Sequence, residues 1–401
     1  MTTTKKADSA TEAALIPSAQ IQGLPHVLDA VGHVATAPAA AALSPAAARA
    51  SAAQLRLLDR DHSILAFNER VFHWVGRKDV PLLERLRYLC IVSSNLDEFF
   101  EVRAEPHITA ARTGETKGEH TVATFEALSA KAHDLVERQY ALYNDALMPA
   151  LAREGVRVVS HGERNAAQRR WVHEYFVREV RPLLVPISLD PAHPFPQVAN
   201  KSLNFIVRLK GSDAFGRENE IAIVRVPRLL PRFTRMPAKV APKGMQFVSV
   251  SSVVRAHLTD LFPGREVVEF AQFRVTRHSD LAVDEEDVRN LRTVLRQGLQ
   301  HRNFGTAVRL EVSAGSSEYL ADFLLRQFDL PRAALYRVQG PVNLVRFSQL
   351  IDLVANPAWM FAPWRPTWPH QIQPSASILE QLKQGDVLLH QPFESFDGVL
   401  A

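Results

Sequence analysis

The chain has little of what marks several common classes of protein. Its 401 residues include one cysteine, Cys90, so it can form neither an intramolecular disulfide nor a cysteine-rich zinc site. No apolar run approaches the roughly 18 residues of a membrane-spanning helix. The motifs GxGxxG, HExxH and GxSxG are absent. These absences predict a protein of the reducing cytoplasm and argue against dinucleotide, zinc-peptidase and serine-hydrolase chemistry.

The composition is that of a globular protein. Apolar residues make up 46% of the chain and the net charge is +4. At roughly 100–200 residues per domain, this length predicts two to three domains. A mildly basic protein suits a polyanionic ligand, although an ordinary surface explains the charge as well. The aromatic and basic interleaving of single-strand binders is lacking, so nucleic acid is not an expected partner.

The texture of the sequence divides the chain into four parts. Residues 1–53 are rich in alanine and predict a disordered tail, whereas 54–155 have the apolar spacing of a helical bundle. In 156–366, strand-like and helical runs alternate, which predicts a mixed α/β head domain. Residues 367–401 follow a proline cluster and predict a linker and the first strand of another domain. The expected fold class is therefore α+β and multidomain.

The most informative stretch is Pro81 to Arg103, PLLERLRYLCIVSSNLDEFFEVR. Apolar residues at helical spacing predict a buried helix face that ends at a polar break, Ser93-Ser94-Asn95. Asn95 followed by Glu98 has the form of a helix cap with its reciprocal carboxylate. The free N–H groups of such a second helix could bind an anion. Capping alone would also explain Asn95.

Asp97 and Glu101 follow one turn apart in the same stretch. Their carboxylates could hold a magnesium ion. The alternative is that they are acidic first-turn residues favoured by the helix dipole. The spacing leaves both open and favours the second.

Other candidates have ordinary structural explanations. The acidic run at 284–287 opens an expected helix whose later arginines, like Arg309 on an expected strand, could face a polyanion. The segment 211–217 has the glycines of a phosphate loop without its Lys-Ser/Thr, so it predicts a hairpin turn. Cys90 fits core packing, and His390 is a weak candidate for a nucleophile.

Several motifs resemble the amino-terminal and head domains of bacterial polyphosphate kinase, of the larger, histidine-phosphorylating class. The family's "PLLERLRFLGIFSNNLDEFFxVR" is similar to residues 81–103, and its "RELSWLxFNxRVL" to residues 60–72, with Ile64 in place of the usual tryptophan. "DPxxPFPxxxNKSLN", "AVRLEV", "GPLDL" and "DVLLHHPYxSF" resemble further segments, which are residues 190–204, 307–312, 340–344 and 386–396. The first long match has Ser94 where many relatives have asparagine, but it keeps Asn95.

The resemblance implies a function and one site residue. The family transfers the terminal phosphate of ATP reversibly to polyphosphate through a phosphohistidine, with magnesium. It implies that Asn95 contacts ATP, and that the catalytic histidines and magnesium-associated arginines lie in two phospholipase-D-like domains that this chain ends before. The expectation is thus an inactive part of a homo-oligomeric kinase, without catalytic or metal-binding residues of its own. It would be cytoplasmic, with peripheral attachment to the inner membrane face also compatible. The alternative is a non-catalytic module for nucleotide or polyphosphate binding or for oligomerisation.

Overall fold

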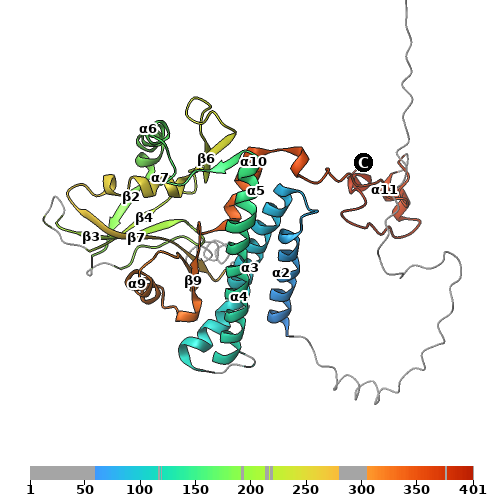
Figure 1. Ribbon diagram of the computed structural model, residues 1–401. Coiled ribbons are helices and arrows are strands. Elements are labelled where there is room, and N and C mark those ends of the chain that lie inside the picture. Colours follow the sequence, from blue (N-terminus) through green and yellow to red (C-terminus); the bar gives the residue numbers. More distant parts are fainter. Residues whose placement is uncertain are drawn as a thin grey trace, which may run out of the picture. The chain divides into compact units, whose positions relative to one another are not determined.

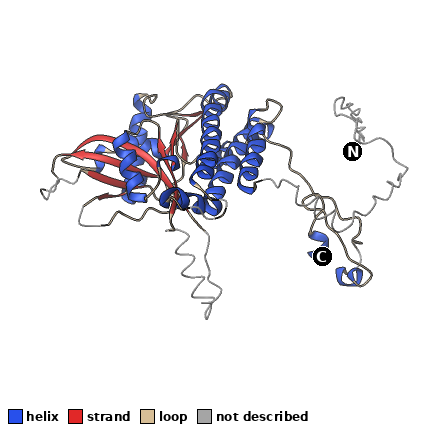
Figure 2. Ribbon diagram, turned by 90° about the horizontal axis from the view of Figure 1, so that it is seen from below, coloured by secondary structure: helices blue, strands red, loops and turns tan. Residues whose placement is uncertain are grey.

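The computed structural model describes residues 59–115, 118, 120–190, 194–212, 216, 220–279, 305–374 and 377–400, all within one structural unit. The predicted tail at 1–53 and the predicted helix from 284 to 300, with its acidic run, lie outside these residues. Figure 2 shows the long helices gathered in one half of this unit and the strands in the other. The predicted fold class, a helical region followed by a mixed α/β region, is confirmed.

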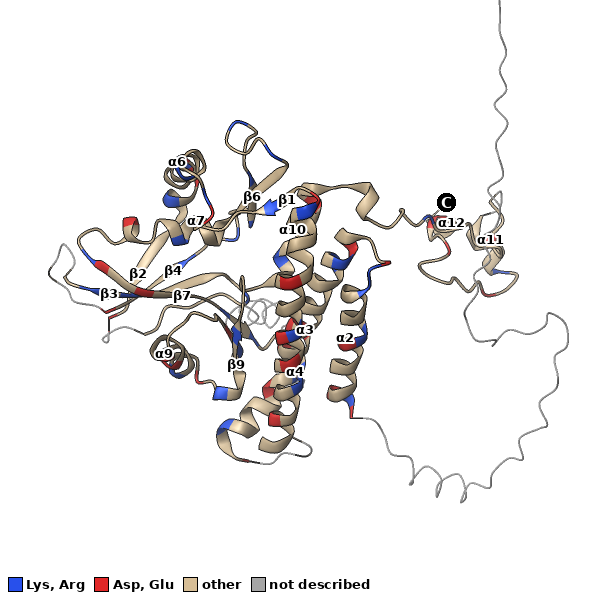
Figure 3. Ribbon diagram, in the orientation of Figure 1, with Lys and Arg blue, Asp and Glu red and all other residues tan. Residues whose placement is uncertain are grey.

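The first half of the unit consists of helices joined by short connections. Their bounds are α2 (Arg60–Gly76), α3 (Leu82–Thr113), α4 (Val122–Leu142) and α5 (Met148–Arg153). Helices α2, α3 and α4 contact one another side by side (Figure 1). A π-helical turn, Tyr143–Leu147, leads from α4 into α5. Figure 3 shows acidic and basic residues interspersed along these helices.

Helix α3 runs without interruption through the polar break, so the predicted second helix start at Asn95 is wrong. The helix has 32 residues, and its N-cap is Pro81. Leu89, Val92 and Leu96 are almost fully buried on both sides of the break, and Ser93 is itself buried. Burial of a continuous apolar stripe outweighs the few tenths of a kcal/mol by which serine and asparagine disfavour helix interiors. No cap, and no anion site of free N–H groups, exists at Asn95.

Helix α2 exposes two of its aromatic residues rather than burying them. The side chain of Phe67 is 53% exposed and that of Trp74 is 38% exposed. The buried stripe is instead Asp61, Leu65, Asn68 and Val75. Two of these are polar and are buried because each finds a hydrogen-bonding partner on α3.

The second half contains two sheets. The larger has the strand order β2-β4-β3-β7-β8-β9, with every pair antiparallel except β8 and β9. Its strands are β2 (Val185–Ser188), β3 (Asn204–Lys210), β4 (Ile221–Arg225), β7 (Glu266–Arg277), β8 (Ala307–Ser313) and β9 (Leu335–Val338). The smaller sheet has the order β1-β6-β5, with strands β1 (Val156–Val158), β6 (Met245–Ser249) and β5 (Phe233–Arg235). The predicted hairpin at 211–217 is confirmed, because β3 and β4 pair antiparallel across it.

Some helices pack against the larger sheet, and some connect its strands along the sequence. Helix α9 (Glu318–Phe328) connects the parallel strands β8 and β9. Helix α3 contacts β7 and β8 (Figure 1), and thereby joins the helical half to the sheet. The remaining helices are α6 (Ala166–Tyr175), which continues as a π-helical turn to Val180, α7 (Val250–Ala256) and α10 (Ser348–Val354).

The predicted strand at the start of a further domain is wrong. Residues 385–396 form one isolated bridge, between Thr367 and Glu394, and otherwise turns and irregular backbone. A strand requires a neighbour to take its hydrogen bonds, and none of the described residues supplies one here. The short helices of this region are α11 (Ile378–Leu382) and α12 (Asp397–Leu400).

Candidate functional site

The predicted nucleotide-contacting residue, Asn95, lies in the middle of α3 and is half-buried. Its amide nitrogen donates to Oδ1 of Asn68 on α2 at 3.1 Å. Asn68 in turn donates to the backbone carbonyl of Val92 at 3.0 Å. Within the described residues, the side-chain oxygen Oδ1 of Asn95 accepts no hydrogen bond. The pair therefore fixes the direction of Asn95 and leaves one polar atom for a ligand.

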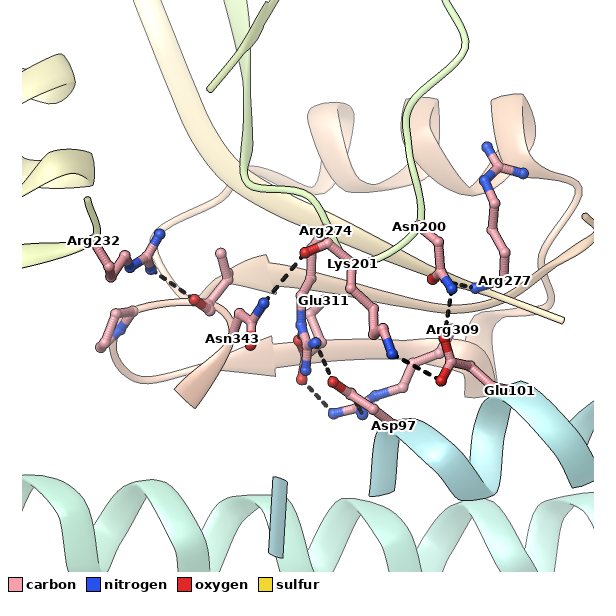
Figure 4. A network of polar contacts seen from close by, with 12 residues as sticks. Asp97, Glu101, Asn200, Lys201, Arg232, Arg274, Arg277, Arg309, Glu311 and Asn343 are labelled. Atoms are coloured by element: carbon pink, nitrogen blue, oxygen red, sulfur yellow. Dashed lines mark hydrogen bonds and ion pairs between the residues drawn. The ribbon is translucent and has the colours of Figure 1, made fainter. Parts of the chain in front are cut away.

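Two residues further along α3, Asp97 enters a buried network of four charged side chains (Figure 4). Asp97 accepts from Arg274 on β7 at 2.8 Å and lies 3.4 Å from Nη1 of Arg309 on β8. Both arginines also donate to Glu311 on β8. All four side chains are at most 5% exposed. The network joins α3 to the larger sheet.

The network contains two acidic and two basic side chains, and burial acts against its ion pairs. Burial lowers the pKa of Arg274, but the charges of Asp97 and Glu311 outweigh it, so this pKa lies above its ordinary value. Burial raises the pKa of Glu311, but Arg274 and Arg309 outweigh it, and this pKa lies below its ordinary value. Arg309 is also stacked between two aromatic rings, with its guanidinium carbon 5.0 Å from the centroid of Phe100 and 4.6 Å from that of Tyr336. Arg309 therefore does not face a polyanion in solvent, which corrects that expectation.

Glu101, one turn after Asp97, connects α3 to the loop before β3. Its carboxylate accepts from the amide of Asn200 and, at 2.8 Å, from Nζ of Lys201. Asn200 also accepts from the backbone N–H of Arg277 at 3.0 Å, so the loop is held on its other side by β7. Figure 4 shows both acids of α3 pointing at the sheet and this loop.

These contacts decide between the interpretations of Asp97 and Glu101. They are not first-turn acids, because they lie in the middle of a helix. They also do not fit a magnesium ion, because each carboxylate is bonded to at least one cationic side chain, which repels a metal cation. Their role is to anchor α3.

Two other groups within the described residues have ligand spacing for a metal ion. In the buried group, ligand atoms of Asp61, His107 and His120 all lie within 4.8 Å of one another. Asp61, however, already accepts from Arg103 at 2.8 Å and contacts His107 at 2.9 Å. A guanidinium that is bonded to a carboxylate disfavours a cation beside it. The other group, His173, His257 and Asp260, is more exposed.

The other candidates lie apart from this site. Cys90 is buried on α3, and burial raises the pKa of its thiol to about 12, as expected of a packing residue. His390 lies at a surface turn beside the ring of Phe393. Sequence reasoning missed Asn68, Arg274 and Glu311. The signal for Asn68 was an amide on the helix stripe that also contains Leu65 and Val75.

Comparison with known proteins finds relatives over most of the chain. Residues 57–159 match the model of the "Polyphosphate kinase N-terminal domain", and residues 167–350 match that of the "Polyphosphate kinase middle domain". Polyphosphate kinase of a Neisseria meningitidis strain is 47% identical over 351 residues, which cover 86% of this chain and 51% of that protein. That of a Pseudomonas syringae strain is 45% identical and is covered to 47%. The chain thus spans about half the length of the curated relatives it matches.

A solved structure shares the fold. The crystal structure of polyphosphate kinase from Porphyromonas gingivalis superposes with a TM-score of 0.69 over 86% of this chain and 48% of that one, at 23% identity. The contact between α3 and the sheet joins the two matched domains. Helix α3 lies in the N-terminal domain, and Arg274 and Arg309 lie in the middle domain. The chain belongs to the polyphosphate kinase family, of which it contains the N-terminal and middle domains.

Proposed function

We propose that the chain is the nucleotide-side portion of a polyphosphate kinase, which transfers the terminal phosphate of ATP reversibly to polyphosphate through a phosphohistidine. The observation that carries the proposal is the Asn68–Asn95 pair. It fixes the side-chain amide of Asn95 on a continuous helix, at the position that matches the family's nucleotide-contacting asparagine. We infer the substrates, ATP and polyphosphate, from the family of the relatives, which are named polyphosphate kinase.

The surroundings of Asn95 suit a pocket that is completed by other residues. Ser94 and Glu98, its neighbours on the outer face of α3, are exposed, and so is 37% of the apolar side chain of Ile91. One amide on a helix face offers a nucleotide only a hydrogen bond or two. Affinity of the chain for ATP should therefore be weak, on the order of millimolar, or about −4 kcal/mol.

The chemical step would fall to residues beyond those discussed. Covalent phosphoryl transfer needs a nucleophile and cations that offset the charge of the transferring phosphate. When bound, Mg²⁺ supplies part of that charge. Since Asp97 and Glu101 are bonded to cationic side chains, its ligands are expected outside this site. The 401 residues alone should then bind substrate without transferring phosphate.

Calorimetric titration with ATP tests the role of Asn95. Asn95→Ala should weaken binding about fivefold, the equivalent of roughly 1 kcal/mol for one hydrogen bond. Ser94→Ala, one position earlier on the same helix, is the matched control and should bind like the original chain. Equal affinity of all three proteins would reduce Asn95 to a partner of Asn68.

Incubation with γ-labelled ATP and magnesium tests the division of labour. The chain alone should form neither labelled polymer nor labelled protein. Mixing it with a separately expressed carboxy-terminal half of a close relative should restore polymer formation if the two are complementary parts. Label on the chain alone that disappears in His390→Ala would overturn the proposal, whereas binding without activity in any mixture would favour a non-catalytic module.

The proposal includes a homo-oligomer and a cytoplasmic location with peripheral contact to the membrane. None of the helices in the described part of the chain has the length and apolarity to cross a bilayer. Light scattering and cell fractionation would test the two expectations separately.

A further inference from the structure

A small pocket beside the charged network is lined by four cationic side chains and, among the residues that the structure describes, by no carboxylate. They are Lys201, Arg228, Arg232 and Arg346, and Asn343 and Gln349 also line the pocket. Its volume is about 40 Å³. That is room for a few water-sized atoms, about the size of one phosphate group.

Arg232 is the central residue of this pocket. It is 5% exposed, and its terminal nitrogen donates to the carbonyl of Val342 at 2.8 Å. Its Nε is buried and has no hydrogen-bonding partner among the described residues. Burial lowers the pKa of Arg232 to about 10, and Arg346 and Arg274 add to this effect. A buried guanidinium that is offset by no carboxylate is unusual, because unpaired buried charge is costly.

The other cations of the pocket are also short of negative partners. Arg228 donates to the carbonyl of Asn200, and Arg346 forms no ion pair with any described residue. Lys201 is paired with Glu101 at 2.8 Å, the one carboxylate that contacts these four side chains within the described parts of the chain. The group therefore has an excess of positive charge, three charges by this count.

Asn343 supplies a second orphaned polar atom. The residue is 7% exposed and its amide donates to the carbonyl of Lys201 at 3.2 Å, but its Oδ1 has no partner within the described part of the chain. Lys201 and Asn343 both have positive φ, 56° and 68°, a conformation that costs energy outside glycine and recurs at ligand sites. Figure 4 shows Arg232, Asn343 and Lys201 beside the network that fixes α3.

We propose that this pocket, the Arg232 pocket, binds one phosphate group between Lys201, Arg228, Arg232 and Arg346. A phosphate oxygen would accept from the free Nε of Arg232, and a protonated oxygen could donate to Oδ1 of Asn343. The ligand class is free orthophosphate or the end of a polyphosphate chain. In naming polyphosphate the inference rests on the proposed function, whereas the anion site itself does not.

Calorimetry on the 401-residue chain tests the pocket with three probes, orthophosphate, tripolyphosphate and ATP. Arg346→Gln should weaken binding of the first two about tenfold, and added sodium chloride should weaken it further. Arg326→Gln removes the same charge from an exposed site on α9 and is the matched control, with unchanged affinity expected. Arg232→Lys keeps the charge but removes Nε, and should also weaken orthophosphate binding.

The outcomes separate this proposal from the one above. Binding of both orthophosphate and tripolyphosphate that is equal in the original chain, Arg346→Gln and Arg326→Gln would overturn the pocket, whatever Asn95→Ala does to ATP. A loss in Arg346→Gln would support the pocket even if ATP does not bind at all. If only tripolyphosphate responds to Arg346→Gln, the source is a chain end rather than free phosphate. Circular dichroism before each titration identifies any variant that fails to fold. Arg346→Gln should fold, because Arg346 is half-buried and forms no ion pair with a described residue.

Discussion

Asp97→Ala should destabilise the protein more than any ordinary surface change, because it unbalances buried charge. The network contains two carboxylates and two guanidiniums, all at most 5% exposed. Removing Asp97 leaves Arg274 and Arg309 to share Glu311, with one positive charge uncompensated in the interior. Breaking a buried ion pair from one side typically costs about 3–5 kcal/mol, and we expect a loss in this range.

Urea unfolding followed by circular dichroism measures the effect as a lower midpoint at unchanged slope. Glu98→Ala is the matched control, because Glu98 is the next residue of the same helix but is exposed. Its stability should lie within about 0.5 kcal/mol of the original chain.

A paired substitution tests the reasoning more strictly. Asp97→Leu combined with Arg309→Met removes one charge of each sign and leaves the neutral pair of Arg274 and Glu311. The double variant should be more stable than the sum of the two single losses predicts, by about 1–3 kcal/mol. The argument fails if the two losses simply add, or if Asp97→Ala resembles Glu98→Ala.

Further predictions concern single residues. Asn68→Ala should weaken ATP binding about as much as Asn95→Ala, since it removes the group that orients the amide; unchanged calorimetric affinity would contradict this. Because burial raises the pKa of Cys90 to about 12, the folded chain should react with a thiol reagent at pH 8 only after denaturant is added. Burial raises the pKa of Asp61, but hydrogen bonds from His107 and an arginine outweigh it and hold it below the ordinary 3.8. Its stabilising effect is thus present above pH 3.8 and lost as pH falls through the lower folded value, so acid titrations of the original chain and of Asp61→Asn should converge in that range. Gly244→Ala should cost at least about 2 kcal/mol by urea unfolding, because φ is +68° and the added Cβ would overlap a backbone carbonyl.

Much of the fold follows from local patterns. The strands β3, β4, β6, β7, β8 and β9 and helix α9 lie where alternating or continuous apolar runs predict them. The short strands β1, β2 and β5 have three or four residues, too few to show a period, and exist because neighbouring strands take their hydrogen bonds. The strand expected at 385–396 failed for the converse reason, the lack of a neighbour among the described residues.

The site could be predicted only in part. The resemblance identifies Asn95, but the helix cap predicted for it is wrong. Local polarity indicates a break there, whereas the buried apolar residues on both sides keep the helix continuous. The partners of Asp97 lie 177 and 212 residues away in sequence, and no local pattern can announce such pairings. Neither could charge alone show that Arg232 lacks a carboxylate, since that depends on which side chains the fold brings to one pocket.

Helix α3 has a mechanical consequence. Its 32 residues form a helix about 48 Å long. Asp97 and Glu101 bind it to the sheet and to the loop before β3, and a hydrogen bond to Asn68 joins it to α2. Swinging the bundle away from the sheet would expose four charged side chains at once, at a cost far above thermal energy. The helical half and the sheet half should therefore move as one rigid body. If the protein opens and closes around a ligand, the hinge is expected elsewhere than between these domains, and Asn95 and the Arg232 pocket should keep a fixed separation throughout.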